Sequence, residues 1–307
     1  MNRALLFSGQ GSQYVGMLKD IADKYSTAKD KVRYAESILG YKISDICFHG
    51  PLETLTETRY TQPALFLHSA IIMDLLDERL PFDAVAGHSV GEYAALYASN
   101  VLSFKDALKL VALRGELMFK AGEIEPGTMF AVIGIDDEKV EKVCEELNKN
   151  GNGNVVVPAN YNSPGQIVVS GSAQYLRENI IAFKKAGAKI VKELVVSGAF
   201  HSPLLTPVKK ELEQAILSVP FRKPKVPIYT NVYAKPSTDV NEIREALIAQ
   251  LTSPVRWTHT LLLMKQYGIN EFIEIGPGKV LQGLVKRTLE NVLISGIDNA
   301  EEIVKYL

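Results

Sequence analysis

Residues 82–96 read Phe-Asp-Ala-Val-Ala-Gly-His-Ser-Val-Gly-Glu-Tyr-Ala-Ala-Leu and contain the clearest structural signal in the chain. Residues 82–87 have the apolar character of a buried strand, and residues 92–96 that of a helix. A G-x-S-x-G pattern joins them, and a sharp strand-to-helix turn of this kind raises the hydroxyl of Ser89 above the sheet edge. The N–H of Val90 then points at a developing oxyanion. This context favours a nucleophilic Ser89 over a simple tight turn.

Strands and helices alternate on both sides of this stretch. A short apolar strand at residues 4–7 precedes the helices expected at 15–39 and 63–76, and a helix at 104–121 follows the serine. After residue 204 the pattern predicts helices at 205–218, 241–251, 257–267 and 279–290, with strands at 226–232 and 271–275. Such alternation is typical of a mainly parallel sheet covered on both faces. We therefore expect an α/β protein with a large α/β-hydrolase-like domain.

The middle of the chain has a different order of elements. Strands are expected at 128–135, 154–160, 166–171 and 189–195, with helices at 138–148 and 173–186. The order β-α-β-β-α-β is that of a ferredoxin-like domain. We place this small domain at 126–196, inserted into a large domain made of 1–125 and 197–307. A cleft between two domains is a favoured position for a ligand site.

Composition excludes several classes of protein. The 307 residues carry 34 Lys and Arg against 35 Asp and Glu, a formal net charge of -1, which argues against a nucleic-acid-binding protein. The two cysteines, Cys47 and Cys144, form no CxxC pair. No secretory signal or membrane span is visible, so we expect a cytoplasmic protein. We also expect it to act as a monomer.

A serine nucleophile needs a base, and His201 is the strongest of the five histidines. It lies where the chain leaves the small domain and re-enters the large one. His68 lies in an apolar helix, which indicates a core residue, whereas His49 and His259 lie in polar surroundings. His88 adjoins the serine, and we expect it to support the site. No Asp or Glu is an obvious partner for the base, so a backbone carbonyl could orient it instead.

Two further segments allow more than one interpretation. Gly9-Gln10-Gly11 follows the first strand but lacks the pattern of a dinucleotide-binding loop or a P-loop. A loop whose N–H groups approach an anion, as an oxyanion hole requires, fits it better. Arg114 lies in a largely apolar helix. By itself it favours a surface arginine with a buried stem, and the alternative is a bidentate clamp on a substrate carboxylate.

Together these segments resemble one family, the malonyl-CoA:acyl-carrier-protein transacylases of bacterial fatty-acid synthesis. The matching motifs follow the family order from residue 7 to about residue 287: Phe7–Gln13, Thr61–Leu65, Gly87–Tyr93, Arg114-Gly115, Asn162–Gln166, Ala199–Ser202, Pro254–Trp257 and Glu274–Lys279.

The resemblance implies a role for each matched residue. Ser89 would be the nucleophile and His201 the general base, oriented by the main-chain carbonyl of Gln250. The N–H groups of Gln10 and Val90 would form the oxyanion hole. Arg114 would pair with the malonyl carboxylate. The other pocket residues would be Asn160 or Asn162, His88, and Phe200, which fills the space that an extra methyl group would need.

The implied reaction is ping-pong transfer of malonyl from malonyl-CoA to the phosphopantetheine thiol of acyl carrier protein, with no bound cofactor or metal. Carrier proteins are acidic, and Lys189, Lys286 and Arg287 are candidates for docking, although ordinary solvated charge explains them equally well. The alternatives are a polyketide acyltransferase, which differs only in its carrier protein, a serine thioesterase or esterase, and a non-catalytic carrier-binding module.

Overall fold

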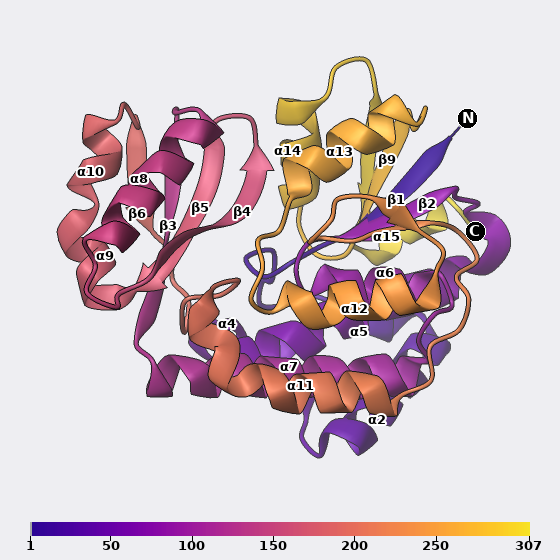
Figure 1. Cartoon of the computed structure of the whole chain (residues 1–307). Coiled ribbons are helices and arrows are strands. Elements are labelled where there is room, and N and C mark those ends of the chain that lie inside the picture. Colours follow the sequence, from indigo (N-terminus) through magenta and orange to yellow (C-terminus); the bar gives the residue numbers. More distant parts are fainter. Residues whose placement is uncertain (1) are drawn as a thin grey trace.

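The computed structural model describes residues 2–307 and contains two separate β-sheets (Figure 1). The larger has the order β10-β9-β1-β2-β7-β8. Its strands are β1 (Arg3–Phe7), β2 (Ala84–Gly87), β7 (Ile228–Tyr229), β8 (Pro236–Ser237), β9 (Glu271–Ile275) and β10 (Leu293–Ile297). All neighbours pair parallel except β7 and β8, which form an antiparallel edge. The expected parallel sheet is confirmed.

The residues of strand β1 show that this sheet is buried on both faces. Leu5 and Phe7 belong to one hydrophobic core, while Ala4 and Leu6 belong to a second core on the other face. This division follows from the two-residue period of a strand. The first core is filled from α5 (Thr58–Leu76), α6 (Gly91–Ala98) and α7 (Phe104–Ile124), and the second from α13 (Trp257–Gln266) and α14 (Val280–Thr288).

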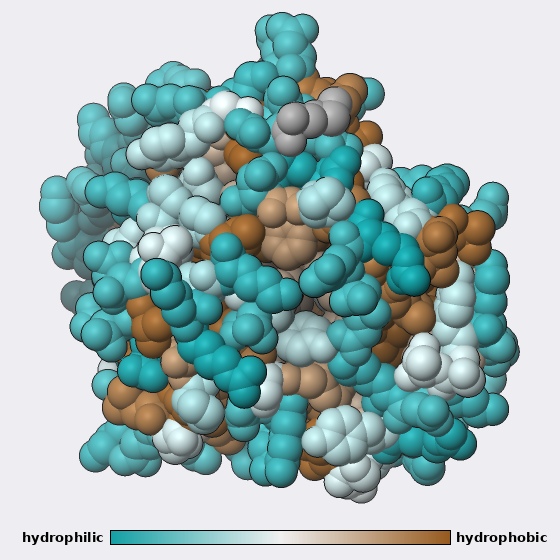
Figure 2. Space-filling view, turned by 90° about the vertical axis from the view of Figure 1, so that its right-hand side faces the viewer, coloured by the Kyte–Doolittle hydropathy of each residue, from teal (hydrophilic) through white to brown (hydrophobic). Residues whose placement is uncertain are grey.

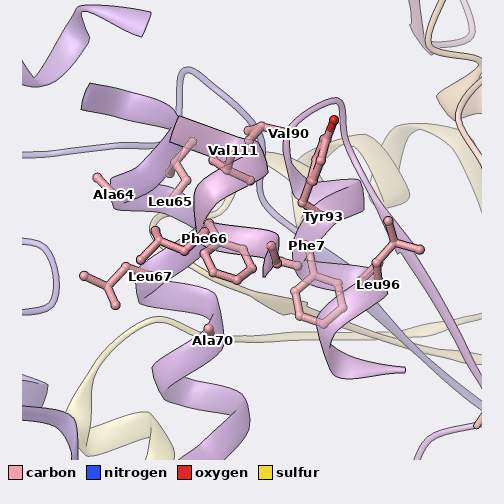
Figure 3. Packing of buried hydrophobic residues seen from close by; sticks show 14 of the residues in the cluster. Phe7, Ala64, Leu65, Phe66, Leu67, Ala70, Val90, Tyr93, Leu96 and Val111 are labelled. Carbon is pink, nitrogen blue, oxygen red and sulfur yellow. The ribbon is translucent and has the colours of Figure 1, made fainter. Parts of the chain in front are cut away.

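The first core packs against the turn that carries Ser89. In Figure 3, the rings of Phe7 of β1 and Phe66 of α5 lie near each other, and Tyr93 of α6 points away from them toward the opposite side of the view. All three are at most 1% exposed. The remaining helical segments are α1 (Lys19–Lys24), α2 (Ser26–Leu39), α3 (Ile43–His49), α4 (Leu52–Thr56), η1 (Asp77–Arg79), η2 (Pro203–Leu205), α11 (Thr206–Ser218), α12 (Val240–Gln250) and α15 (Ala300–Val304).

Two local expectations were wrong. The helix expected at 15–39 is interrupted at Tyr25, whose extended backbone separates α1 from α2. Helix α5 begins at Thr58, so Pro63 lies beyond its first turn. The earlier start is stabilised by the Thr61 hydroxyl, which donates to the carbonyl of Leu55 at 2.5 Å.

The smaller sheet is antiparallel and has the order β4-β5-β3-β6. Its elements are β3 (Gly127–Ile133), α8 (Asp137–Lys149), β4 (Val156–Ser163), β5 (Gln166–Ser172), α9 (Ala173–Asn179), α10 (Ile181–Lys185) and β6 (Ile190–Glu193). A hydrophobic core of its own includes Val132, Val140 and Phe183. The ferredoxin-like β-α-β-β-α-β order is confirmed, while the boundaries at 126 and 196 stay a prediction.

Backbone hydrogen bonds join the small sheet to the large domain. The N–H of Tyr161 in β4 donates to the carbonyl of Val255 at 2.9 Å, and the N–H of Val255 donates to Ala159 at 2.8 Å. These bonds join edge strand β4 to the segment just before α13, so one end of the small sheet is tied directly to the large domain.

The side of the molecule shown in Figure 2 is mostly hydrophilic, and its hydrophobic areas are small and separate. Within residues 2–307, no helix is both long enough and apolar enough to cross a bilayer.

Candidate active site

The turn that carries Ser89 is sterically demanding. Strand β2 ends at Gly87, Ser89 adopts a φ of 53°, and α6 begins at Gly91. A Cβ on Gly87 would lie 1.9 Å from the carbonyl carbon of Gly91, and a Cβ on Gly91 would lie 2.2 Å from the carbonyl oxygen of Phe7. Only glycine fits at either position. The two glycines therefore allow the strained turn that presents the serine.

Ser89 and His201 lie within hydrogen-bond distance of each other. The Oγ of Ser89 is 2.8 Å from Nε2 of His201, and Nδ1 of His201 is 2.9 Å from the carbonyl oxygen of Gln250. Because a carbonyl only accepts, Nδ1 carries the hydrogen and Nε2 presents a lone pair to the serine hydroxyl. A backbone carbonyl thus holds the imidazole in the position where many serine enzymes have a carboxylate.

The environment of His201 keeps the imidazole neutral. The side chain is 3% exposed. Burial, assisted by the positive charge of Arg114, lowers the pKa of His201 to about 3. A neutral imidazole at physiological pH can accept the proton of Ser89.

Arg114 is buried in the centre of the site, so the surface interpretation of this residue is wrong. It is fully buried on α7. Its Nη2 donates to Oγ of Ser89 at 3.0 Å and to Oε1 of Gln250 at 3.0 Å, and its Nη1 donates to Oε1 of Gln62 at 2.8 Å. Among the described residues, no carboxylate oxygen lies within 4.0 Å of this guanidinium.

A cavity of about 140 Å³ opens beside the serine. Besides Ser89 and His201, it is lined by the predicted residues Gln10, His88, Val90, Asn160, Asn162 and Phe200. Apolar side chains complete its wall, among them Met118, Met129, Val168, Leu194 and Val196. The cavity lies between the two sheets, since Met129 and Val168 come from the small one.

His88 and Gln10 connect the walls of the cavity. Nε2 of His88 lies 2.8 Å from Oδ1 of Asn162, which reaches across from β4. The side-chain amide of Gln10 donates to Oγ1 of Thr58 at 3.2 Å, and that hydroxyl is 2.7 Å from Oγ of Ser197. The loop after β1 is therefore tied to the segment that leads to His201.

The three docking candidates do not form one cluster. Lys286 and Arg287 are exposed in the last turn of α14, which contacts β4. Lys189 is exposed immediately before β6, the edge strand on the opposite side of the small sheet (Figure 1).

Three residues of the site were not identified from the sequence: Gln62, Glu92 and Asn231. The Oδ1 of Asn231 accepts from the N–H of Ser89 at 2.8 Å, and its Nδ2 donates to the carbonyl of Gly87 at 2.7 Å. The Oε2 of Glu92 accepts from the N–H of Asn231 at 3.0 Å and from Nε2 of Gln250 at 2.8 Å. Gln62 and Glu92 fall within matched motifs, which was the available signal; nothing in the sequence singled out Asn231.

Comparison with known proteins gives a consistent result. Residues 4–305 match the acyl transferase domain family. The chain is 39% identical over 310 residues to a malonyl CoA-acyl carrier protein transacylase from Haemophilus influenzae, covering 99% of this chain and 98% of the relative.

Solved structures agree with these sequence matches. A crystal structure of an acyl carrier protein S-malonyltransferase from Vibrio cholerae is 39% identical, with a TM-score of 0.94 and complete coverage of both chains. A malonyl-transacylase solved in complex with a type II polyketide acyl-carrier protein is 37% identical, with a TM-score of 0.94, covering 100% of this chain and 99% of that one.

Proposed function

Because this chain belongs to the malonyl-CoA:acyl-carrier-protein transacylases of the acyl transferase family, we propose that it transfers malonyl groups from malonyl-CoA to the phosphopantetheine thiol of acyl carrier protein. The product supplies extender units for fatty-acid synthesis. One observation carries the proposal: a buried guanidinium, that of Arg114, donates directly to the hydroxyl of Ser89. A plain hydrolase has no use for a buried cation at its nucleophile, whereas an enzyme for a carboxylated acyl group does.

The first half-reaction loads the enzyme. Nε2 of His201 takes the proton of Ser89 as Oγ attacks the thioester carbon of malonyl-CoA. Backbone N–H groups of Gln10 and Val90 would stabilise the tetrahedral oxyanion. When the intermediate collapses, the C–S bond breaks, and the proton on His201 passes to the departing thiolate of CoA. A malonyl-serine ester remains.

The second half-reaction uses the same groups in reverse. The phosphopantetheine thiol enters the space that CoA has left, and His201 takes its proton. The thiolate attacks the ester carbon of malonyl-Ser89, and the proton returns to Oγ of the serine as the malonyl group leaves. A thioester is exchanged for a thioester, so the reaction is balanced without an external energy source.

Arg114 supplies the selectivity for a carboxylated acyl group. In the free enzyme its Nη2 donates to Oγ of Ser89, and that bond would be given up when Oγ becomes an ester oxygen. The malonyl carboxylate would replace it with a charge-assisted pair, which a planar guanidinium can make with two parallel bonds. An acetyl group would leave the buried guanidinium without this partner.

The cavity limits the size of the acyl group. A volume of about 140 Å³ suits a small acyl unit, and Phe200 is among the residues that form its wall. We infer that Phe200 excludes branched groups such as methylmalonyl. Asn160 and Asn162, together with His88, would complete the polar part of the wall.

The two-domain arrangement explains how two large substrates reach one serine. We place the small domain at 126–196, so that the cleft between it and the rest of the chain admits the pantetheine arm of CoA or of the carrier protein. Lys286 and Arg287 would attract an acidic carrier to the α14 side of this cleft. Lys189 lies at the opposite edge of the small sheet and would take no part in that contact. The enzyme would work in the cytoplasm as a monomer, without a bound cofactor.

The proposal is tested by following the fate of the malonyl group. Purified enzyme is mixed with malonyl-CoA and a holo carrier protein from either a fatty-acid or a polyketide system, and the carrier is analysed by mass spectrometry. We expect a malonyl-sized gain on the fatty-acid carrier that Ser89→Ala abolishes. Release of free malonate without carrier loading would favour a thioesterase, and loading of the polyketide carrier alone would favour polyketide synthesis.

A further inference from the structure

In the substrate-free enzyme, the buried positive charge of Arg114 has no anionic group in direct contact with it in the described part of the chain. Its guanidinium is completely buried, yet its three hydrogen-bond acceptors are neutral groups on Gln62, Ser89 and Gln250. Its Nε has no acceptor among the described residues. A buried charge without a counter-charge is strongly destabilising, so an anion close by is expected.

The carboxylate of Glu92 can supply this negative charge. It lies in the first turn of α6, three residues after Ser89, and is 1% exposed. The side-chain amide of Gln250 connects it to the guanidinium, because Oε1 accepts from Nη2 of Arg114 at 3.0 Å while Nε2 donates to Oε2 of Glu92 at 2.8 Å. The two neighbours dictate the amide orientation, since a guanidinium only donates and a carboxylate only accepts.

The groups around Glu92 have opposing effects on its protonation. Arg114 on α7 is the positive charge that faces it, Tyr93 is the titratable neighbour on its own helix, and Gln250 and Asn231 are neutral donors. Its second oxygen, Oε1, has no partner within residues 2–307. Burial raises the pKa of Glu92 to about 7, against the opposing effects of the hydrogen bonds from Gln250 and Asn231 and of the charge on Arg114.

We propose that Glu92 is a positioning residue that serves as the internal counter-charge of Arg114 through Gln250, and that it takes up a proton when a malonyl carboxylate assumes that role. This inference rests on the proposed function. The incoming carboxylate adds a negative charge next to the guanidinium, so a second buried anion becomes unfavourable. A proton from solvent neutralises Glu92, and the net charge of the buried cluster is preserved. An acetyl group brings no charge and leaves Glu92 as it was.

The same carboxylate also holds the reacting groups in place. Oε2 of Glu92 accepts from the N–H of Asn231, whose side chain fixes the N–H of Ser89, and from Gln250, whose carbonyl fixes His201. The substitution Glu92→Gln separates the two roles, because a glutamine carbonyl oxygen can accept both bonds but carries no charge.

Proton uptake on binding is the decisive measurement. In a Ser89→Ala background, which binds malonyl-CoA without reacting, titration calorimetry at pH 7 in two buffers of different ionisation enthalpy counts the protons taken up. Acetyl-CoA is the matched control, because it carries the same titrating phosphates. We expect malonyl-CoA to take up a fraction of a proton more than acetyl-CoA. We expect this excess to vanish in Ser89→Ala/Glu92→Gln.

Each result bears on a different claim. Equal proton uptake for both ligands, or an excess that persists in the double variant, would overturn the role of Glu92 while leaving the proposed function intact. Failure of Ser89→Ala to bind malonyl-CoA would overturn the proposed function and this inference with it. If Glu92→Gln does not fold, the affinity ratio in Ser89→Ala replaces it. That ratio, malonyl-CoA over acetyl-CoA, should fall by up to about tenfold per pH unit above pH 7, and a flat ratio would refute the proposal.

Discussion

The clearest consequence of this site concerns Arg114→Ala. The substitution removes a buried guanidinium that we place against the malonyl carboxylate, while the contacts of His201 with Oγ of Ser89 and with the carbonyl of Gln250 involve no atom of Arg114. Each charge-assisted hydrogen bond lost is worth about 1.5–3 kcal/mol. Two such bonds amount to roughly 3–6 kcal/mol, or a factor of about 10²–10⁴ at 1.4 kcal/mol per tenfold change.

The effect on acetyl-CoA should be opposite. Acetyl has no carboxylate, so in the wild-type enzyme it costs Arg114 the hydrogen bond to Oγ of Ser89 without giving the guanidinium a new anionic partner, which is a penalty for acetyl transfer. Removing the cation removes that penalty, so acetyl transfer should rise relative to malonyl transfer. We expect the ratio of kcat/KM for malonyl-CoA over acetyl-CoA to fall by about 10²–10⁴.

The assay compares acyl transfer from both thioesters to one holo carrier protein under single-turnover conditions. Arg114→Lys is the matched control: it keeps the charge but loses the two-pronged geometry, and should fall between the wild type and Arg114→Ala. If Arg114→Ala slows both thioesters equally and the ratio stays unchanged, the guanidinium does not bind the substrate carboxylate and our reasoning fails.

Four further predictions follow from the same geometry. Because burial and Arg114 hold the pKa of His201 near 3, the acylation rate of Glu92→Gln, which lacks the carboxyl group with a pKa of about 7, should show no inflection near 6.5 between pH 5 and 8. Stopped-flow detection of such an inflection in this variant would contradict a neutral His201. The same depressed pKa means that only the unfolded chain protonates this histidine between its ordinary pKa of 6.5 and about 3, so its contribution to stability should fall as pH falls through that window in urea titrations. Gly91→Ala forces a Cβ to 2.2 Å from the carbonyl of Phe7, so the melting temperature should drop by several degrees and activity should be lost; a variant with wild-type melting and activity would show that the turn can relax. Lys286→Glu combined with Arg287→Glu should raise the KM for carrier protein several-fold without changing self-malonylation by malonyl-CoA, whereas equal effects on both steps would rule out docking at α14.

Local sequence signals accounted for most of the fold and for the turn that carries Ser89. The G-x-S-x-G turn, the β-α-β-β-α-β order and the buried character of His68 follow from residue periods and turn chemistry, and the structure contains all three. Strand β10 was missed although Leu293, Ile294 and Ile297 are apolar, because Ser295 and Gly296 interrupt the short apolar run. Strand β8 has two residues, too few for any period.

The site depended more on tertiary structure. An arginine in an apolar helix has the same local pattern whether its head group reaches solvent or a buried serine, and only the packing of α5, α6 and α7 decides that for Arg114. The carbonyl of Gln250 was assigned through family resemblance, since any backbone carbonyl could orient a histidine. Neither the local sequence pattern nor the family resemblance identified Asn231, because its role depends on β7 lying beside β2.

The proposed mechanism requires Ser89 to carry the malonyl group covalently. Intact-protein mass spectrometry after brief mixing with malonyl-CoA detects such an intermediate, with acetyl-CoA, no substrate and Ser89→Ala as controls. We expect a malonyl-sized adduct on the wild type alone that a pantetheine thiol or holo carrier protein removes. An adduct that survives Ser89→Ala, or the absence of any adduct while malonyl transfer proceeds, would contradict this mechanism.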